Sequence, residues 1–391
     1  MDDAAFDQLT QSCSRRAGLK GLIAGLVGIL SFSAVEARVQ VPPTCGGTGM
    51  QCASGDECCS GRCILKSDGT SRCARTTSNR KKKNMTKNAD SGPPPNCTVC
   101  ASGCAHRTIE QAILHAEPGA EVTIHQGTYR PTNIVDPQQD WAIKINKTMT
   151  VRACDENTEP VKIVPPANKL LFYIANSDES DNCQFEPIGV TLSGLILDST
   201  GIAGTRAVKT LCNMTSDGFK LIDVQVRKFD GQFAALTFYD GPVLIDQCEL
   251  AQNSSDSYRG SLIHCFGTDL TIHDTAIHDN TSRSNNPEGG IVGHNGGYGE
   301  LLTLTGTTEI FDNIVQATSS GGGVWVGQAQ SPNWGMESTV KIHNNTGASA
   351  GGGIAAYTEP TAGSVVDNTT VYDNTATSCN DVYIASNLTC N

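Results

Sequence analysis

The chain has 391 residues, long enough for one elongated domain or for up to three of average size. Charged residues make up 17%, aromatic residues 5% and Gly 40 residues, which argues against coiled coils and helix bundles and leaves a β-rich chain. The formal net charge of −12 makes nucleic acid a poor partner, because binding phosphates requires a clustered cationic face. The 17 cysteines point to an oxidising compartment.

Residues 1–37 have the features of an export signal. Residues 14–20 form a positive region that resembles a twin-arginine signal, with Gly18 where an aromatic residue usually stands, and cleavage after Ala37 fits the small residues there. An uncleaved membrane anchor is the alternative, although about 15 apolar positions fall short of the roughly 20 that a span needs. We therefore expect a secreted or cell-surface protein with no membrane span once the signal is removed.

Residues 45–73 contain six cysteines and almost no apolar core, so only disulfides could order so short a segment: Cys45, Cys52, Cys58, Cys59, Cys63 and Cys73. Six cysteines allow fifteen pairings, and the residues alone do not choose among them. The spacing C-x6-C-x5-C-C-x3-C-x9-C resembles the inhibitor cystine knot, or knottin, family. That resemblance implies the pairs Cys45–Cys59, Cys52–Cys63 and Cys58–Cys73. The module at residues 45–73 would act as a small ligand-binding or inhibitory domain, and the alternative is that it serves only as a stable spacer.

Residues 74–96 combine a basic run at 80–83 with three prolines at 93–95 and have no apolar run. Such a segment cannot bury surface, and we expect a solvated linker. The alternatives are contact with anionic glycan or lipid headgroups and cleavage by a protease.

Residues 97–391 begin with one short amphipathic helix. Ile109, Ala112, Ile113 and Ala116 share one helical stripe, and Pro118 stops it. Short apolar or alternating runs bounded by Gly, Asn, Asp or Ser follow and predict strands at residues 121–125, 148–151, 161–164, 190–197, 219–226, 243–250 and 270–277.

Two motifs then repeat in constant phase. The first is Ile277-His278-Asp279-Asn280, which recurs at residues 310–313, 342–345 and 371–374, at separations of 33, 32 and 29 residues. The second is a glycine motif at residues 289–291, 321–324 and 351–354. The constant phase of the two motifs indicates one structural unit per period. Because the unit is short and contains no helix, it predicts a coil of two or three strands, stacked in parallel on identical coils.

Residues 108–129 match almost every position of T-I-x-x-A-I-x-x-A-x-P-G-x-x-V-x-I-x-x-G-T-Y, a signature of secreted β-helix repeat proteins. The chain thus resembles the right-handed parallel β-helix, pectate-lyase-like superfamily. The resemblance implies an all-β right-handed parallel β-helix solenoid whose N-terminal helix caps the open end of the cylinder. Taking about 27 residues per coil gives about ten coils and a length near 50 Å.

Ten further cysteines lie in this region. Cys97, Cys100, Cys104 and His106 could be read as a metal site, but no second ligand pair is nearby, so we expect disulfides and no metal. Removing Cys13 with the signal leaves sixteen cysteines, an even number. Nine Asn-x-Ser/Thr sequons also occur, and either glycosylation or chance in an Asn-rich chain explains them: Asn84, Asn96, Asn146, Asn213, Asn253, Asn280, Asn344, Asn368 and Asn387.

Two polysaccharide-degrading chemistries fit the expected fold poorly. A pectate-type lyase needs calcium-binding carboxylates and a cationic base, and residues 230–391 carry only three cations against 17 acids. The earlier coils keep Arg152, Lys162, Arg206, Lys209, Arg227 and Lys228. A glycoside hydrolase needs two carboxylates roughly 5 to 9.5 Å apart, for which the candidates are Asp246, Asp269, Asp274 and Asp279.

Binding without turnover needs only aromatic platforms and hydrogen-bond donors. Alignment of the glycine motifs predicts that Trp325 and Tyr357 show one outer face, with His294 one coil earlier as a surface or turn residue, and that a loop at 328–338 projects Trp334. Packing of Trp325 beneath that loop is the alternative. The aligned His278, Phe311, His343 and Tyr372 predict a structural ladder of side chains.

The leading hypothesis is an exported, monomeric, non-catalytic β-helix that binds an extracellular polysaccharide or another surface glycan without a cofactor. The alternatives are a polysaccharide lyase or glycoside hydrolase of the same fold, and a purely structural envelope protein.

Overall fold

The computed structural model describes residues 63–65, 71–73, 97–132, 139–176, 187–211, 214–256, 262–283, 289–295, 300–316, 320–327, 333–347, 349–385 and 389–390. They belong to two separate units. In the smaller unit β1 (Cys63–Leu65) pairs with β2 (Ser71–Cys73) as an antiparallel hairpin, with Cys63 opposite Cys73 in the register. The other four cysteines of the predicted knottin module, and the expected export signal and linker, lie outside the described residues.

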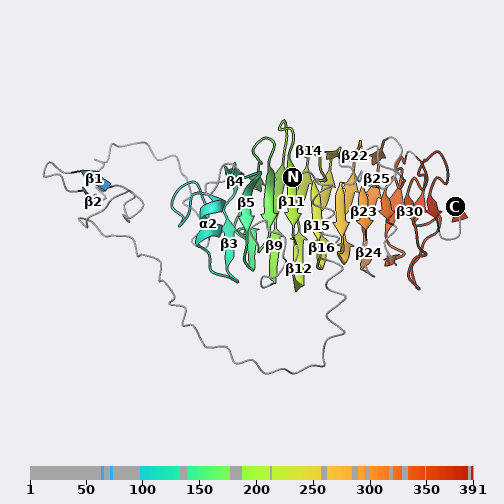
Figure 1. Cartoon of the computed structure of the whole chain (residues 1–391), viewed down its shortest axis with the longest axis horizontal. Helices are drawn as coiled ribbons and strands as arrows, with labels where there is room; N and C mark the ends of the chain where they lie inside the picture. Colours follow the sequence, from blue (N-terminus) through green and yellow to red (C-terminus); the bar gives the residue numbers. More distant parts are fainter. Residues whose placement is uncertain are drawn as a thin grey trace, which may run out of the picture. The chain divides into compact units, whose positions relative to one another are not determined.

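The larger unit opens with the expected helix. Helix α2 (Ile109–His115) begins where the Thr108 hydroxyl accepts a hydrogen bond from the Gln111 amide at 3.2 Å, an N-cap. Ile109, Ala112 and Ile113 are buried in the main apolar core, as the helical stripe predicts. The helix packs against the first strands of two sheets (Figure 1).

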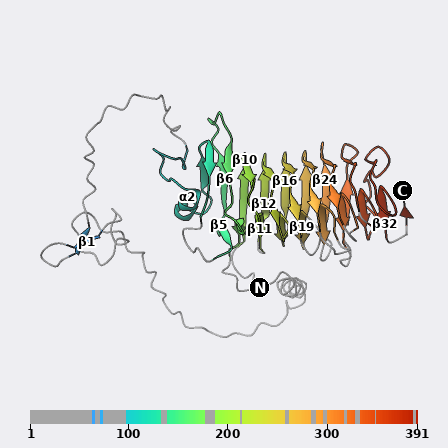
Figure 2. The same ribbon diagram turned by 90° about the horizontal axis from the view of Figure 1, so that it is seen from above.

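Three parallel sheets run along the solenoid, and each complete turn of the described chain contributes one strand to each (Figures 1 and 2). The eight-stranded sheet contains β3 (Glu121–Ile124), β6 (Met149–Ala153), β9 (Ile188–Ser193), β12 (Met214–Ile222), β16 (Val243–Asp246), β20 (Leu270–His273), β24 (Leu301–Thr305) and β28 (Asn333–Met336). The nine-stranded sheet contains β4 (Gly127–Tyr129), β7 (Val161–Ile163), β10 (Leu195–Asp198), β13 (Gln225–Arg227), β17 (Glu249–Ala251), β21 (Ala276–His278), β25 (Glu309–Phe311), β29 (Lys341–His343) and β31 (Val371–Tyr372).

The ten-stranded sheet contains β5 (Trp141–Ile145), β8 (Leu170–Ile174), β11 (Arg206–Thr210), β15 (Leu236–Tyr239), β19 (Ile263–Phe266), β23 (Val292–Asn295), β27 (Val324–Val326), β30 (Ile354–Ala356), β32 (Val382–Ile384) and β33 (Thr389–Cys390). Among the described strands of this sheet, β33 alone is antiparallel to its neighbour. A small four-stranded sheet adds β14 (Asp230–Gly231), β18 (Ser254–Ser255), β22 (Thr281–Ser282) and β26 (Ile314–Val315). The parallel solenoid predicted from the repeats is confirmed.

The number of coils was overestimated. The eight-stranded sheet limits the described structure to about eight complete turns, whereas 27 residues per coil gives about ten. The reason is that some turns carry longer connections: Leu170 and its register partner Arg206 are 36 residues apart (206 − 170).

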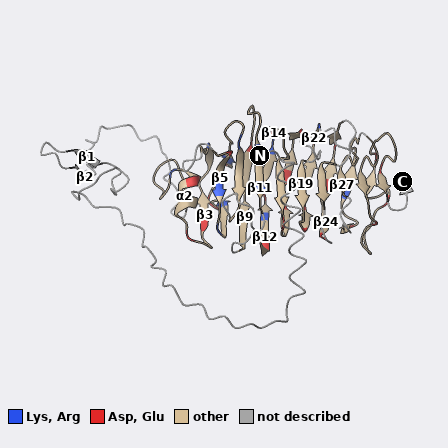
Figure 3. Ribbon diagram, in the orientation of Figure 1, with Lys and Arg blue, Asp and Glu red and all other residues tan. Residues whose placement is uncertain are grey.

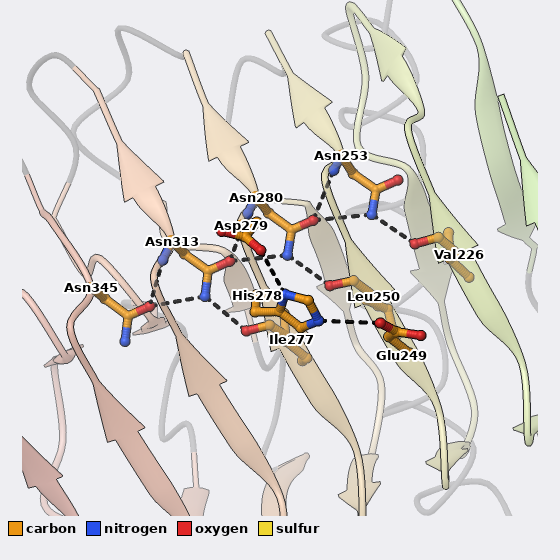
Figure 4. Close-up of polar contacts among 10 residues, drawn as sticks. All are labelled: Val226, Glu249, Leu250, Asn253, Ile277, His278, Asp279, Asn280, Asn313 and Asn345. Atoms are coloured by element: carbon orange, nitrogen blue, oxygen red, sulfur yellow. Dashed lines mark hydrogen bonds and ion pairs between the residues drawn. The ribbon is translucent and has the colours of Figure 1, made fainter. Parts of the chain in front are cut away.

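The interior is mainly apolar, and a ladder of buried amides runs along it (Figure 4). We call this set the asparagine ladder: Asn253, Asn280, Asn313, Asn345 and Asn374. The Oδ1 of each later member accepts the backbone N–H and one Nδ2 hydrogen of the member before it, at 2.9 to 3.2 Å. The ladder starts where Phe229 N–H donates to Asn253 and ends where Asn374 donates to the Asp381 carboxylate.

The expected disulfides are confirmed near the N-terminal end of this unit, where Cys97 pairs with Cys154 and Cys100 with Cys104. Cys379 is also disulfide-bonded. Two described cysteines, Cys248 and Cys265, form no disulfide and are free thiols. Both are buried, and burial raises the pKa of Cys248 to about 12, so it stays an inert thiol.

Candidate functional site

The outer surface of the ten-stranded sheet carries a run of aromatic side chains. We call it the aromatic face: Trp141, Tyr173, Tyr239, Phe266, Trp325 and Tyr357. The first four form an apolar cluster with Leu170, Ala175 and Leu211 that is separate from the main core. Strand alternation places these rings on the side of the sheet away from the main core, since their neighbours Phe172, Phe238 and Cys265 belong to that core. All four rings are nevertheless buried, at 3% to 9% exposed.

Cations lie over the rings at the start of the aromatic face. Trp141 stacks on Tyr173 with ring centroids 4.7 Å apart, and Lys144 Nζ lies 5.7 and 5.9 Å from the two centroids. On a later coil Lys209 Nζ lies 5.8 Å from the ring of Tyr239. These are cation–π distances, so the ammonium groups stabilise the rings.

Trp325 and Tyr357 share the outer side of this sheet, as predicted. Trp325 pairs with Ala355 in the register, and Tyr357 follows two residues later with the same parity. Their rings meet edge to face at 6.5 Å and 83°. Trp325 is only 2% exposed and lies where a Cβ on Gly327 would stand, whereas Tyr357 is 36% exposed. Tyr357 is therefore the accessible ring of the pair, and Trp325 supports it.

The predictions for Trp334 and His294 were wrong. Trp334 lies in β28, not in a projecting loop, and its ring is in the main core with its Nε1–H donating to the Thr358 carbonyl at 2.9 Å. His294 lies in β23 opposite Val326 and points inward, fully buried, with Nε2 2.8 Å from the Thr268 carbonyl. Burial lowers the pKa of His294, which favours the neutral ring. Neither side chain can contact a surface glycan.

The predicted side-chain ladder on the nine-stranded sheet is confirmed. His278, Phe311, His343 and Tyr372 stack with centroids 4.9, 5.4 and 5.1 Å apart and interplanar angles of 14° or less. We call this set the ring ladder. Their faces cover one another, so the ladder offers ring edges to solvent and is poorly suited to stack on sugars.

Carboxylates flank the histidines of the ring ladder. His278 lies 3.3 Å from Glu249 and 2.9 Å from Asp279, a candidate catalytic residue, as Figure 4 shows. His343 lies 3.8 Å from Glu309. Asp279 is thus engaged as a partner of the ladder.

Two of the candidate hydrolytic carboxylates come together. Asp246, Asp274 and His273 have ligand-type atoms within 4.8 Å of one another, a group of the kind that can hold a metal ion. Both nitrogens of His273 have protein neighbours, Asp274 at 3.1 Å and Thr305 Oγ1 at 3.0 Å, and Asp274 also accepts hydrogen bonds from Thr307. Asp269 lies elsewhere, accepting the Leu301 amide.

Sequence reasoning missed one perturbed carboxyl group, Asp240. It follows Tyr239 of the aromatic face in the turn between β15 and β16, 2.6 Å from where a Cβ on Gly267 would stand. Burial and the negative charge of Glu300 raise the pKa of Asp240 from 3.8 to about 6. The Asp-Gly-Pro turn that ends a strand was the available signal.

The cations considered for a lyase are mostly engaged in ion pairs. Lys162 and Arg227 both contact the buried Asp198, at 2.7 and 2.9 Å. Arg152 pairs with Glu121 and Asp155 beside a surface pocket of about 450 Å³. Figure 3 marks the charged positions, and most of the ribbon toward the C-terminus is neutral.

No described helix is long and apolar enough to cross a bilayer. No family model matches the chain, and comparisons with curated proteins and with solved structures find no significant match.

Proposed function

We propose that the protein is an exported, non-catalytic β-solenoid of right-handed, pectate-lyase-like type that binds a glycan on its aromatic face. The secreted location and the knottin-like head rest on residues 1–37 and on the cysteine spacing at 45–73. The N-terminal helix acts as the cap that a cylinder with an open apolar end requires.

The observation that carries the proposal is the pair Trp325 and Tyr357. A buried indole packed edge to face holds the exposed phenol ring in place, so the ring loses little conformational freedom when a sugar packs on it. The other rings of the aromatic face are each 9% exposed or less, so Tyr357 is the ring of this set that a sugar can reach.

The negative charge of the C-terminal half of the solenoid argues against anionic glycans as ligands. Residues 230–391 contain 17 acids and three cations, so the part of the solenoid around Tyr357 should repel polyanions. Neutral polysaccharides are the expected ligands.

The test is a glycan array followed by titration of the full chain with the best ligand. Tyr357→Ala should weaken binding by about 5- to 30-fold, because one aromatic contact is worth about 1–2 kcal/mol. Tyr372→Ala is the matched control, since this tyrosine terminates the ring ladder on another sheet. Equal binding by the Tyr357 variant and the native chain contradicts the proposed surface.

A glycoside hydrolase is the second candidate, because Asp240 has the raised pKa that a general acid needs and lies next to the aromatic face. Prolonged incubation with the bound polysaccharide should release no reducing ends. Release that disappears in Asp240→Asn would replace the binding proposal with hydrolysis.

A further inference from the structure

The turns after β21, β25, β29 and β31 of the nine-stranded sheet each hold two adjacent polar residues that lie in different environments. The first has a positive φ: Asp279, Asp312, Asn344 and Asp373, at 53° to 57°. The second enters the buried asparagine ladder. Asn344 is exposed where its neighbour Asn345 is fully buried, so two consecutive asparagines face opposite environments.

Two sequons place their acceptor asparagine inside the ladder. Asn253 and Asn280 are each 1% exposed. Both Nδ2 hydrogens of Asn253 are used, toward the Val226 carbonyl at 2.9 Å and Asn280 Oδ1 at 3.0 Å, and those of Asn280 toward Leu250 and Asn313 (Figure 4). A sugar on Nδ2 would remove one of these bonds and would have no space.

Three sequons place their acceptor asparagine on exposed turns. Asn146 follows β5, Asn344 follows β29, and Asn368 precedes β31. A substituent on any of these side chains can extend into solvent without displacing a strand or a member of the ladder. The sequons at Asn84, Asn96, Asn213 and Asn387 lie outside the described residues.

The chemistry is transfer of an oligosaccharide from a lipid-linked diphosphate donor by a membrane transferase. The Asn Nδ2 forms a bond to the anomeric carbon, the bond from that carbon to the phosphate oxygen breaks, and the lipid diphosphate leaves with the electron pair. One Nδ2 proton goes to a base of the transferase. A ladder asparagine modified before folding could no longer donate both hydrogens, so that chain could not complete its coils.

We propose that Asn146, Asn344 and Asn368 are N-glycan acceptor sites, and that the ladder keeps the sequons at Asn253 and Asn280 unmodified in the folded protein. Folding and glycosylation are mutually exclusive at the two ladder positions. The proposal is independent of glycan binding by the aromatic face.

The test is secretion of the full chain by a eukaryotic cell, enzymatic removal of N-glycans in heavy-oxygen water, and mass spectrometry of the resulting Asn→Asp tags in the folded fraction. Tags are expected at Asn146, Asn344 and Asn368 and at neither ladder asparagine. A tag on Asn253 or Asn280, or no tag at any of the three exposed positions, overturns the proposal.

Two matched variants remove a sequon without touching its asparagine. Thr346→Ala should abolish the tag on Asn344. Ser282→Ala removes the sequon at Asn280, and its buried hydroxyl has no hydrogen-bond partner, so the fold and the glycan pattern should both be unchanged. Loss of a glycan in Ser282→Ala overturns the proposal even if other variants behave as expected.

Discussion

The side-chain oxygen of Asn313 accepts two hydrogen bonds from Asn280, one from its backbone N–H and one from its Nδ2, each 3.0 Å long. Both residues are buried, so water cannot replace either bond. One amide therefore satisfies two donors of the preceding coil while its own Nδ2 serves Ile277 and Asn345.

Asn313→Ala should lower the free energy of unfolding by about 2–4 kcal/mol, because several buried donors and acceptors lose their partners. Asn344→Gly is the matched control, since Asn344 is exposed and its φ of 56° suits glycine. Chemical denaturation compares the two. Similar losses in both variants would show that the ladder contributes no more than an ordinary turn.

Phe311→Ala should destabilise the chain by about 1–2 kcal/mol, because Phe311 stacks between His278 and His343 and loses both ring contacts. Phe311→His keeps a flat ring and should retain most of the stability. If the alanine and histidine variants melt at the same temperature, stacking is not the stabilising interaction.

Asp198→Asn should destabilise the protein at neutral pH. Burial alone would raise the pKa of Asp198, but hydrogen bonds from Lys162 and Thr200 outweigh it and hold the pKa well below 3.8. A lowered folded-state pKa gives stability that is present above pH 3.8 and lost as the pH falls below it. The native chain and the variant should therefore converge in urea midpoint in strong acid, and a constant difference across pH would contradict this.

The effect of Asp240 on stability should depend on pH in the opposite direction to that of Asp198. Its pKa of about 6 is above the 3.8 of the unfolded chain, so its contribution is fully present below pH 3.8 and is lost as the pH rises toward 6. Asp240→Asn should unfold less readily than the native chain at pH 7 and should show a flatter pH profile between 4 and 6. Parallel profiles for the two proteins would rule out a buried, protonated carboxyl group.

Gly322→Ala should cost at least about 2 kcal/mol, because a Cβ there would overlap the Gly352 carbonyl of the next coil. Gly363→Ala is the comparison: no atom lies near its Cβ position, and only its φ of 92° opposes a side chain. Thermal melts should rank Gly322→Ala well below Gly363→Ala, and the reverse order would contradict close packing of the glycine motif.

The repeat that begins at Ile277 correctly predicted which residues of successive coils pair, because a β-branched aliphatic residue occupies the same position in each coil. Ile277, Ile310, Ile342 and Val371 pair in the observed register at the predicted separations, and the ring ladder follows from it. Helix α2 was likewise predictable from its stripe and stop signal, because both depend on local sequence.

The side on which His294 lies could not be predicted from the glycine motif. Aligning Ile291 with Val324 gives a separation of 33, but the structure pairs Val292 with Val324, a separation of 32 (324 − 292). The motif has two glycines before Ile291 and three before Val324, so an alignment on the aliphatic residue that follows the glycines is displaced by one position. A shift of one residue moves every side chain to the other face.

Asp381 gives the asparagine ladder a direction. An amide both donates and accepts, so a row of them could continue indefinitely, but a carboxylate only accepts, and the relay stops where Asn374 meets Asp381. All of the amide dipoles point their positive ends toward that anion, much as a helix points its amino end toward a counter-charge. The ladder is therefore a row of aligned amide dipoles that ends at one carboxylate. The coil that carries Asp381 differs from the earlier ladder coils because its acceptor is a carboxylate and not an amide oxygen.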